Sequence, residues 1–168
     1  MRASFLAILL LASVCIASAT SYLIELPQKL SYSCLIARVR VIKVTQPKNP
    51  SSPVGTALIQ AEILELFKGP VCKEISFSSP AYAMLEPAKL PILMGKEFII
   101  FLHDPSNDGK LWLFEGPEGM RPIARHYTEY RVSSDPDLEL HTDTYSHEQY
   151  LDILRNWKSH VDATKPKP

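Results

Sequence analysis

Apolar and polar residues alternate between residues 56 and 68, in the sequence TALIQAEILELFK. Ile59 and Ile63 would share one face of an extended chain, which is the pattern of a half-buried strand. Helical spacing fits this stretch as well. A second alternating run, at residues 71–77, begins directly after a Gly-Pro pair, and this layout favours two strands joined by a tight turn.

Other segments also have the composition of strands. The sequence YSCLIARVRVIKV alternates, and GKEFIIFL ends in five aliphatic or aromatic residues. KLWLF returns after a run of turn-forming residues at 103–110. These patterns predict strands at residues 32–44, 95–102, 110–114 and, for a shorter one, 129–132. The proline-rich segments 46–55 and 78–94 are expected to connect strands, the second with a turn of helix at 81–85.

One amphipathic helix is predicted near the C-terminus. Ser146 and Gln149 match a capping box, in which each side chain satisfies a backbone N–H of the other residue. An apolar stripe then continues to Val161. Residues 20–30 are expected to be a short irregular lead-in, and residues 164–168 a disordered tail. The predicted fold is mostly β, a small closed five-stranded barrel with this helix packed on it.

The N-terminal segment has the features of a signal peptide. Arg2 precedes an apolar run at residues 5–16, and an Ala-Ser-Ala cleavage sequence ends at residue 19. The alternative is an uncleaved anchor, but the apolar run is short for a membrane span. Residues 1–19 are therefore expected to be removed, leaving a single domain at residues 20–163 that is secreted or periplasmic.

Two cysteines, Cys34 and Cys72, remain after the predicted cleavage. An even number in an exported chain favours a disulfide between them, which would stabilise the fold by about 4 kcal/mol in the loop-entropy model. The alternative is a pair of buried free thiols, because cysteine is common in protein cores.

Composition narrows the classes of function. Hydrophobic residues make up 46% of the 168-residue chain and charged residues 21%, which is typical of a globular protein. The formal net charge is zero, whereas nucleic-acid binders normally carry a basic excess. The sequence therefore disfavours nucleic acid as a partner, and it has no motif that calls for a cofactor.

Three sets of polar residues are candidates for chemistry. His103 and Asp104 lie where a strand meets a turn, a frequent location for catalytic residues. No G-x-S-x-G nucleophile motif accompanies them, and turn chemistry alone explains an aspartate before a proline. Arg38 and Arg40 fall on the more polar face of the first strand, where they would bind an anion or form the solvated side of the barrel.

Acidic residues recur at every second position further along the chain. Asp135, Asp137, Glu139 and Asp143 would share one face of an extended segment with His141. Such oxygen ligands suit Ca²⁺, but a calcium loop needs a curled chain with a glycine, which this segment lacks. The alternative is the solvated face of an edge strand. No histidine or cysteine spacing indicates a zinc site.

The strand SYSCLIARVRVIKV, the strand ending in AEILELFKG and the strand GKEFIIFL together resemble the OB-fold of the netrin-like and tissue-inhibitor-of-metalloproteinase-like superfamily, over about residues 30–115. The resemblance implies a closed barrel whose face and loops bind ligands. In the metalloproteinase inhibitors, a cysteine at the mature N-terminus chelates the zinc ion of the enzyme. Here the expected first residue is Thr20 and the nearest cysteine is Cys34, so that mechanism is not expected.

The sequence thus predicts an exported, non-enzymatic binding module whose partner is a protein or another extracytoplasmic ligand. One alternative is an exported hydrolase or metal-dependent enzyme that uses His103 and Asp104 or the acidic residues 135–143. Another is a metalloproteinase inhibitor that acts by a different route.

Overall fold

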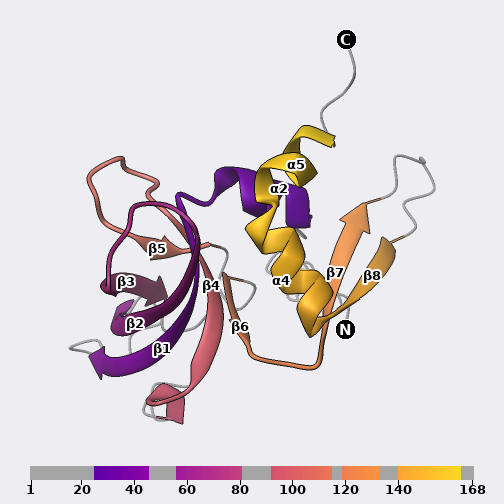
Figure 1. Cartoon of the computed structure of the whole chain (residues 1–168). Coiled ribbons are helices and arrows are strands. Elements are labelled where there is room, and N and C mark those ends of the chain that lie inside the picture. Colours follow the sequence, from indigo (N-terminus) through magenta and orange to yellow (C-terminus); the bar gives the residue numbers. More distant parts are fainter. Residues whose placement is uncertain (1–24, 46–55, 81–91, 115–118, 133–139, 164–168) are drawn as a thin grey trace, which may run out of the picture.

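The computed structural model describes residues 25–45, 56–80, 92–114, 119–132 and 140–163. Five strands form the barrel: β1 (Leu35–Thr45), β2 (Thr56–Lys68), β3 (Glu74–Pro80), β4 (Glu97–His103) and β5 (Trp112–Leu113). Their order is β1-β2-β3-β5-β4, and β1 pairs again with β4 to close the barrel. β3 and β5 run parallel, whereas the other barrel pairs are antiparallel. The predicted OB-like barrel is confirmed (Figure 1).

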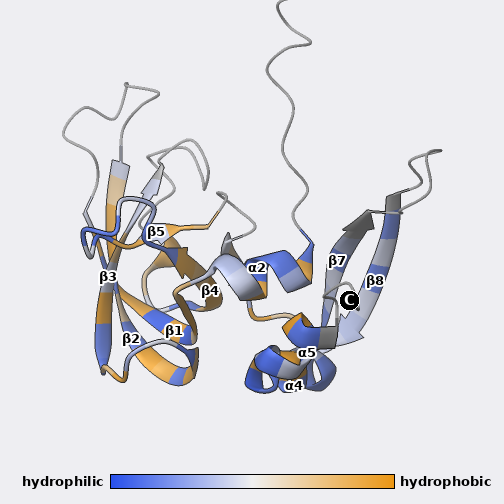
Figure 2. Ribbon diagram, turned by 90° about the horizontal axis from the view of Figure 1, so that it is seen from above, coloured by the Kyte–Doolittle hydropathy of each residue, from blue (hydrophilic) through white to orange (hydrophobic). Residues whose placement is uncertain are grey.

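The remaining elements lie on one side of the barrel. They are α2 (Leu26–Tyr32), β6 (Met120–Pro122), β7 (His126–Val132), β8 (Leu140–Ser146), α4 (His147–Arg155) and α5 (Trp157–Ala163). β6 pairs with β4, while β7 and β8 form a separate antiparallel pair. The helices lie between the barrel and the β7–β8 pair in both views (Figures 1 and 2). No helix in the described ranges is long and apolar enough to span a membrane.

Two hydrophobic clusters share the strands β1 and β4. The first fills the barrel interior and includes Val39, Phe77 and Ile100. The second lies outside it, where Ile36 and Phe101 contact the helices. Because β4 is buried on both faces, its sequence is a continuous apolar run rather than an alternating one.

The Lys-Gly pair that ends β2 joins the barrel to the N-terminal helix. Lys68 Nζ donates hydrogen bonds to the carbonyls of Leu30 (2.8 Å) and Ser31 (3.0 Å), at the C-terminal end of α2. Gly69 has φ +112°, and a Cβ there would lie 3.0 Å from the Cys34 carbonyl oxygen. A side chain at this position would therefore push the chain away from the start of β1.

Several predicted boundaries are wrong. The lead-in contains α2, because Pro27 lies in the first turn, where its missing N–H is not needed. β3 begins at Glu74 rather than directly after Pro70, and Val71 is exposed. β6 was not predicted, and the strand expected at 129–132 begins at His126. The turn of helix expected at 81–85 lies outside the described residues.

The C-terminal helix begins as predicted but is interrupted. Ser146 Oγ accepts from Gln149 N–H (3.3 Å), and Gln149 Oε1 accepts from Ser146 N–H (2.8 Å), which confirms the capping box. The helix then ends at Asn156, whose backbone N–H and side-chain amide both donate to the Asp152 carbonyl (3.0 Å each). α4 and α5 are therefore separate helices.

A buried carboxylate connects the elements beside the barrel. Glu129 of β7 is 2% exposed, and its Oε2 lies 2.7 Å from Nζ of Lys29 in α2, which is 1% exposed. Its Oε1 accepts from the hydroxyl of Tyr150 in α4 (2.6 Å) and lies 3.1 Å from a guanidinium nitrogen of Arg121 in β6. Three elements from the C-terminal part of the described chain, β6, β7 and α4, thus meet α2 at one side chain.

We expect Glu129→Gln to lower the free energy of unfolding by about 3–5 kcal/mol, because it removes the negative charge that faces a buried ammonium group. The double variant Lys29→Met with Glu129→Gln removes both charges, so it should be more stable than Glu129→Gln alone. Urea unfolding of the two single variants and the double variant measures the coupling. Additive effects of the two substitutions would contradict this account.

Candidate functional site

A groove of about 860 Å³ opens at one end of the barrel. Its walls come from residues 32–35 at the start of β1, residues 70–76 at the β2–β3 turn and residues 103–114 around the β4–β5 loop. We call it the barrel-end groove. It brings together four residues that the sequence singled out: Cys34, Cys72, His103 and Asp104.

The two cysteines line this groove as free thiols, so the predicted disulfide is not formed in this structure. Cys34 Sγ donates to the Leu102 carbonyl (3.4 Å), and Cys72 Sγ donates to the Pro70 carbonyl (3.6 Å). Burial raises the pKa of the Cys34 thiol, and the negative charge of Asp104 raises it further. Cys34 is therefore a protonated thiol at neutral pH rather than an activated nucleophile.

His103 and Asp104 have structural partners in this groove. The His103 ring packs edge-on against Phe114, with centroids 5.4 Å apart. Burial lowers the pKa of His103, although the charge of Asp104 partly opposes this, so the imidazole is neutral near pH 7. The Asp104 carboxylate accepts hydrogen bonds from the N–H groups of Asp108 (3.2 Å) and Gly109 (2.8 Å). Turn chemistry accounts for this aspartate, as the simpler interpretation predicted.

Between β4 and β5, Asp104 and Asp108 bind the backbone N–H groups of residues 108–110, so this part of the loop does not extend the sheet. Asp108 accepts from the N–H (3.0 Å) and the ammonium group (2.7 Å) of Lys110. Asn107 and Gly109 have positive φ values of 53° and 79°, which lie outside the extended region of a regular strand. As a result β5 has two residues, and it pairs with β3 only at Ser78.

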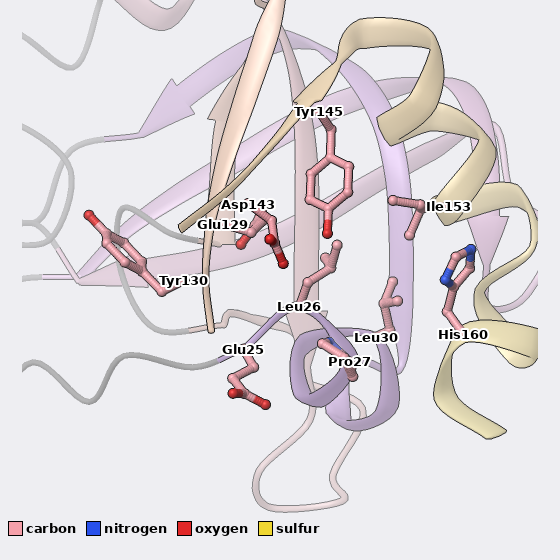
Figure 3. Close-up of a pocket in the computed structure, with 10 residues that line it drawn as sticks. All are labelled: Glu25, Leu26, Pro27, Leu30, Glu129, Tyr130, Asp143, Tyr145, Ile153 and His160. Carbon is pink, nitrogen blue, oxygen red and sulfur yellow. The ribbon is translucent and has the colours of Figure 1, made fainter. Parts of the chain in front are cut away.

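A second cavity, of about 310 Å³, lies between α2, the β7–β8 pair and the C-terminal helices (Figure 3). Apolar side chains such as Leu26, Leu30 and Ile153 line it together with Glu129 and Asp143. The last two are direct neighbours across the β7–β8 ladder. Both oxygens of Glu129 are engaged by the groups described above, so this cavity contains a carboxylate committed to structure.

The structure places only part of the predicted acidic cluster. His141 and Asp143 lie on β8, which pairs with β7 alone in the described region and is therefore an edge strand. Asp135, Asp137 and Glu139 lie outside the described residues. Among the residues that are described, no three or more histidine, cysteine, aspartate or glutamate side chains are grouped so that they hold a metal ion.

The two arginines of β1 are engaged by carboxylates on the outside of the barrel. Arg38 lies 2.7 Å from Glu97, and Arg40 lies 2.9 Å from Glu97 and 3.4 Å from Glu62. These hydrogen bonds, first that from Arg38 and then that from Arg40, lower the pKa of Glu97. The ladder register brings the charges together, which agrees with a solvated barrel face rather than an anion site.

Sequence reasoning missed Lys29 and Glu129. Lys29 lies on the same helical face as Leu26 and Leu30, and Glu129 shares a strand face with Tyr127. A charged residue on an otherwise apolar face of a helix or strand can be recognised from the sequence. Recognising it requires the helix and the strand to be assigned correctly first. No protein-family model matches the sequence, and no curated protein is similar to it at a significant level.

We expect Cys34 to react with iodoacetamide more slowly at pH 7.5 than an unperturbed thiol, because its raised pKa lowers the thiolate fraction. The alkylation rate of Cys34 should increase steeply as the pH approaches and then exceeds 9. Mass spectrometry of protein alkylated without reductant measures the rate at each cysteine. If neither Cys34 nor Cys72 is alkylated until a reductant is added, the result would instead support the predicted disulfide.

Proposed function

We propose that this protein is an exported, non-enzymatic binding module, and that the barrel-end groove is its binding site. The observation that carries this proposal is the position of exposed apolar side chains. Val71 (94% exposed) and Tyr32 (67%) are the most exposed large hydrophobic residues in the described part of the chain. Tyr32 lines the groove, and Val71 stands between its lining residues Pro70 and Cys72.

Exposed apolar residues beside a groove are typical of surfaces that bind proteins. The groove also contains polar groups that recognise a ligand without chemistry: a protonated thiol at Cys34 and a neutral imidazole at His103. Among the described residues that line it, Glu74 and Asp104 are the charged ones, and both are acidic. This combination supports a partner that offers apolar and basic groups.

The alternative is an exported enzyme that uses His103 and Asp104 or the acidic residues 135–143, and it predicts that these residues converge in one concave site. His103 and Asp104 line the barrel-end groove, whereas Asp143 lines the second cavity, and the two share no lining residue. Asp104 is committed to its turn, and Cys34 lacks the lowered pKa of a nucleophile. These observations favour the binding module over the enzyme.

A metalloproteinase inhibitor that acts without an N-terminal cysteine is the remaining alternative. It predicts that the mature protein inhibits at least one member of a metalloproteinase panel at micromolar concentration. The binding-module proposal predicts unchanged hydrolysis of a fluorogenic peptide by every member of the panel. Inhibition that persists after His103→Ala and Val71→Asp would place an inhibitory surface elsewhere and contradict the proposed site.

The groove is tested with a matched pair of substitutions. Immobilised wild-type protein, Val71→Asp and Ile92→Asp are exposed to the exported fraction of the source organism, and the retained molecules are identified by mass spectrometry. Val71 and Ile92 are both exposed, so neither substitution should affect folding. We expect a partner that wild type and Ile92→Asp retain and that Val71→Asp loses by about tenfold or more, equivalent to roughly 1.4 kcal/mol. Equal retention by all three proteins would contradict the proposal.

A further inference from the structure

We propose that the barrel-end groove binds an extended peptide segment of a partner protein, which pairs with β3 as an additional strand. This inference rests on the proposed binding function and specifies the class of partner. Addition of a strand to an exposed sheet edge is a general mode of peptide recognition, in which the backbone provides affinity and side-chain pockets provide specificity.

The two edges of β3 are very unequally used. Along one edge, β3 pairs with β2 over its full length, from Glu74 opposite Glu62 to Pro80 opposite Thr56. Along the other edge, the ladder contains one pair, Ser78 with Trp112, and one further hydrogen bond from Ser78 N–H to the Leu111 carbonyl (2.8 Å). The first half of β3 is therefore an open edge.

The open edge directs backbone groups into the groove. Ser78 N–H points towards β5, and backbone direction alternates along a strand, so the N–H and C=O groups of Ser76 and Glu74 point the same way. The Lys73 carbonyl accepts from Ile63 N–H (2.8 Å) on the opposite edge, as this alternation requires. Glu74 and Ser76 both line the groove, and within the described residues no hydrogen bond joins their outward-facing backbone groups to the 103–111 loop.

The neighbouring loop cannot close this edge without losing its own bonds. The Asp104 carboxylate holds the N–H groups of Asp108 and Gly109, and Asp108 holds that of Lys110. Without these bonds, the N–H groups of the loop would be free to pair with the first half of β3, before Ser78. The loop thus forms the far wall of the groove, and a separate chain has to supply the missing strand.

The lining of the groove indicates which side chains the peptide carries. The exposed Tyr32 and the half-buried Leu111 provide apolar surface for residues on one face of the peptide, whereas the lining residues Leu35, Ile75 and Phe114 are buried. Glu74 and Asp104 provide negative charge, and no lysine or arginine is among the described residues that line the groove. An extended segment with alternating aliphatic and basic residues therefore matches it. A single strand enters a groove more readily than the sheet edge of a second copy of this protein, which brings a whole barrel with it.

The test uses short synthetic peptides in which lysine and valine alternate, one peptide beginning with lysine and the other with valine. Copies of both peptides are methylated at alternate backbone nitrogens, so that they cannot pair along that edge. Hydrogen exchange is followed by NMR on the full mature chain. In the free protein, the amides of Ser76 and Glu74 should exchange much faster than those of Ile75 and Phe77. A bound peptide should slow exchange at Ser76 by about tenfold or more, whereas the methylated copies should give no protection.

Two substitutions at one position separate backbone pairing from other contacts. Ser76→Pro removes the N–H that faces the groove and leaves the β2 edge intact, so peptide binding should weaken by about tenfold or more. Ser76→Ala keeps the N–H and should bind as wild type does. Equal binding by both variants, binding without protection of Ser76, or no saturable binding of any peptide at millimolar concentration would each overturn the inference.

The outcomes distinguish this inference from the proposed function. A partner that depends on Val71 but leaves the Ser76 amide unprotected overturns strand pairing and keeps the binding function. Self-association that Ser76→Pro abolishes makes a second copy the occupant of the edge, which also overturns the inference. Protection of Ser76 by the peptides, together with a captured partner that contains an aliphatic-basic segment, supports both proposals.

Discussion

The fold beside the barrel depends on the neutralisation of one buried carboxylate. Glu129 has almost no contact with solvent, so its charge is tolerable only where Lys29, Arg121 and Tyr150 surround it. Each partner comes from a different element, and the charge is satisfied only when α2, β6 and α4 have all reached their positions around β7. This polar network is satisfied in one arrangement of the segments, whereas apolar packing alone is less specific.

This arrangement makes the barrel asymmetric. The helices cover the outer faces of β1 and β4, where the second hydrophobic cluster forms, and these strands pair from Leu35 opposite Leu102 to Arg40 opposite Glu97. On the opposite side, the turn built by Asp104 and Asp108 limits β5 to two residues. The barrel closes there through one ladder pair, and the open half of β3 becomes one wall of the groove. The binding site proposed here is thus a consequence of how the barrel closes.

The groove also shows that a catalytic role cannot be assigned from residue type alone, because the surroundings of each side chain decide its charge. A cysteine, a histidine and an aspartate line the same groove, yet burial raises the pKa of Cys34 and lowers that of His103, so both groups are neutral near pH 7. The aspartate stabilises a turn instead of orienting the imidazole. These neutral donors and the two carboxylates support the proposal that the groove holds a ligand rather than transforms it.

The local pattern of the sequence determined the barrel strands, the Lys-Gly stop after β2 and the start of the C-terminal helix, because alternation, turn chemistry and a capping box act over a few residues. It located His103 and Asp104 at a turn for the same reason. Only the tertiary structure decided that Lys29 and Glu129 meet, since their partnership spans 100 positions and depends on the packing of several elements. Tertiary structure likewise decided that β3 keeps an open edge, because strand pairing is settled between distant segments and not within either one.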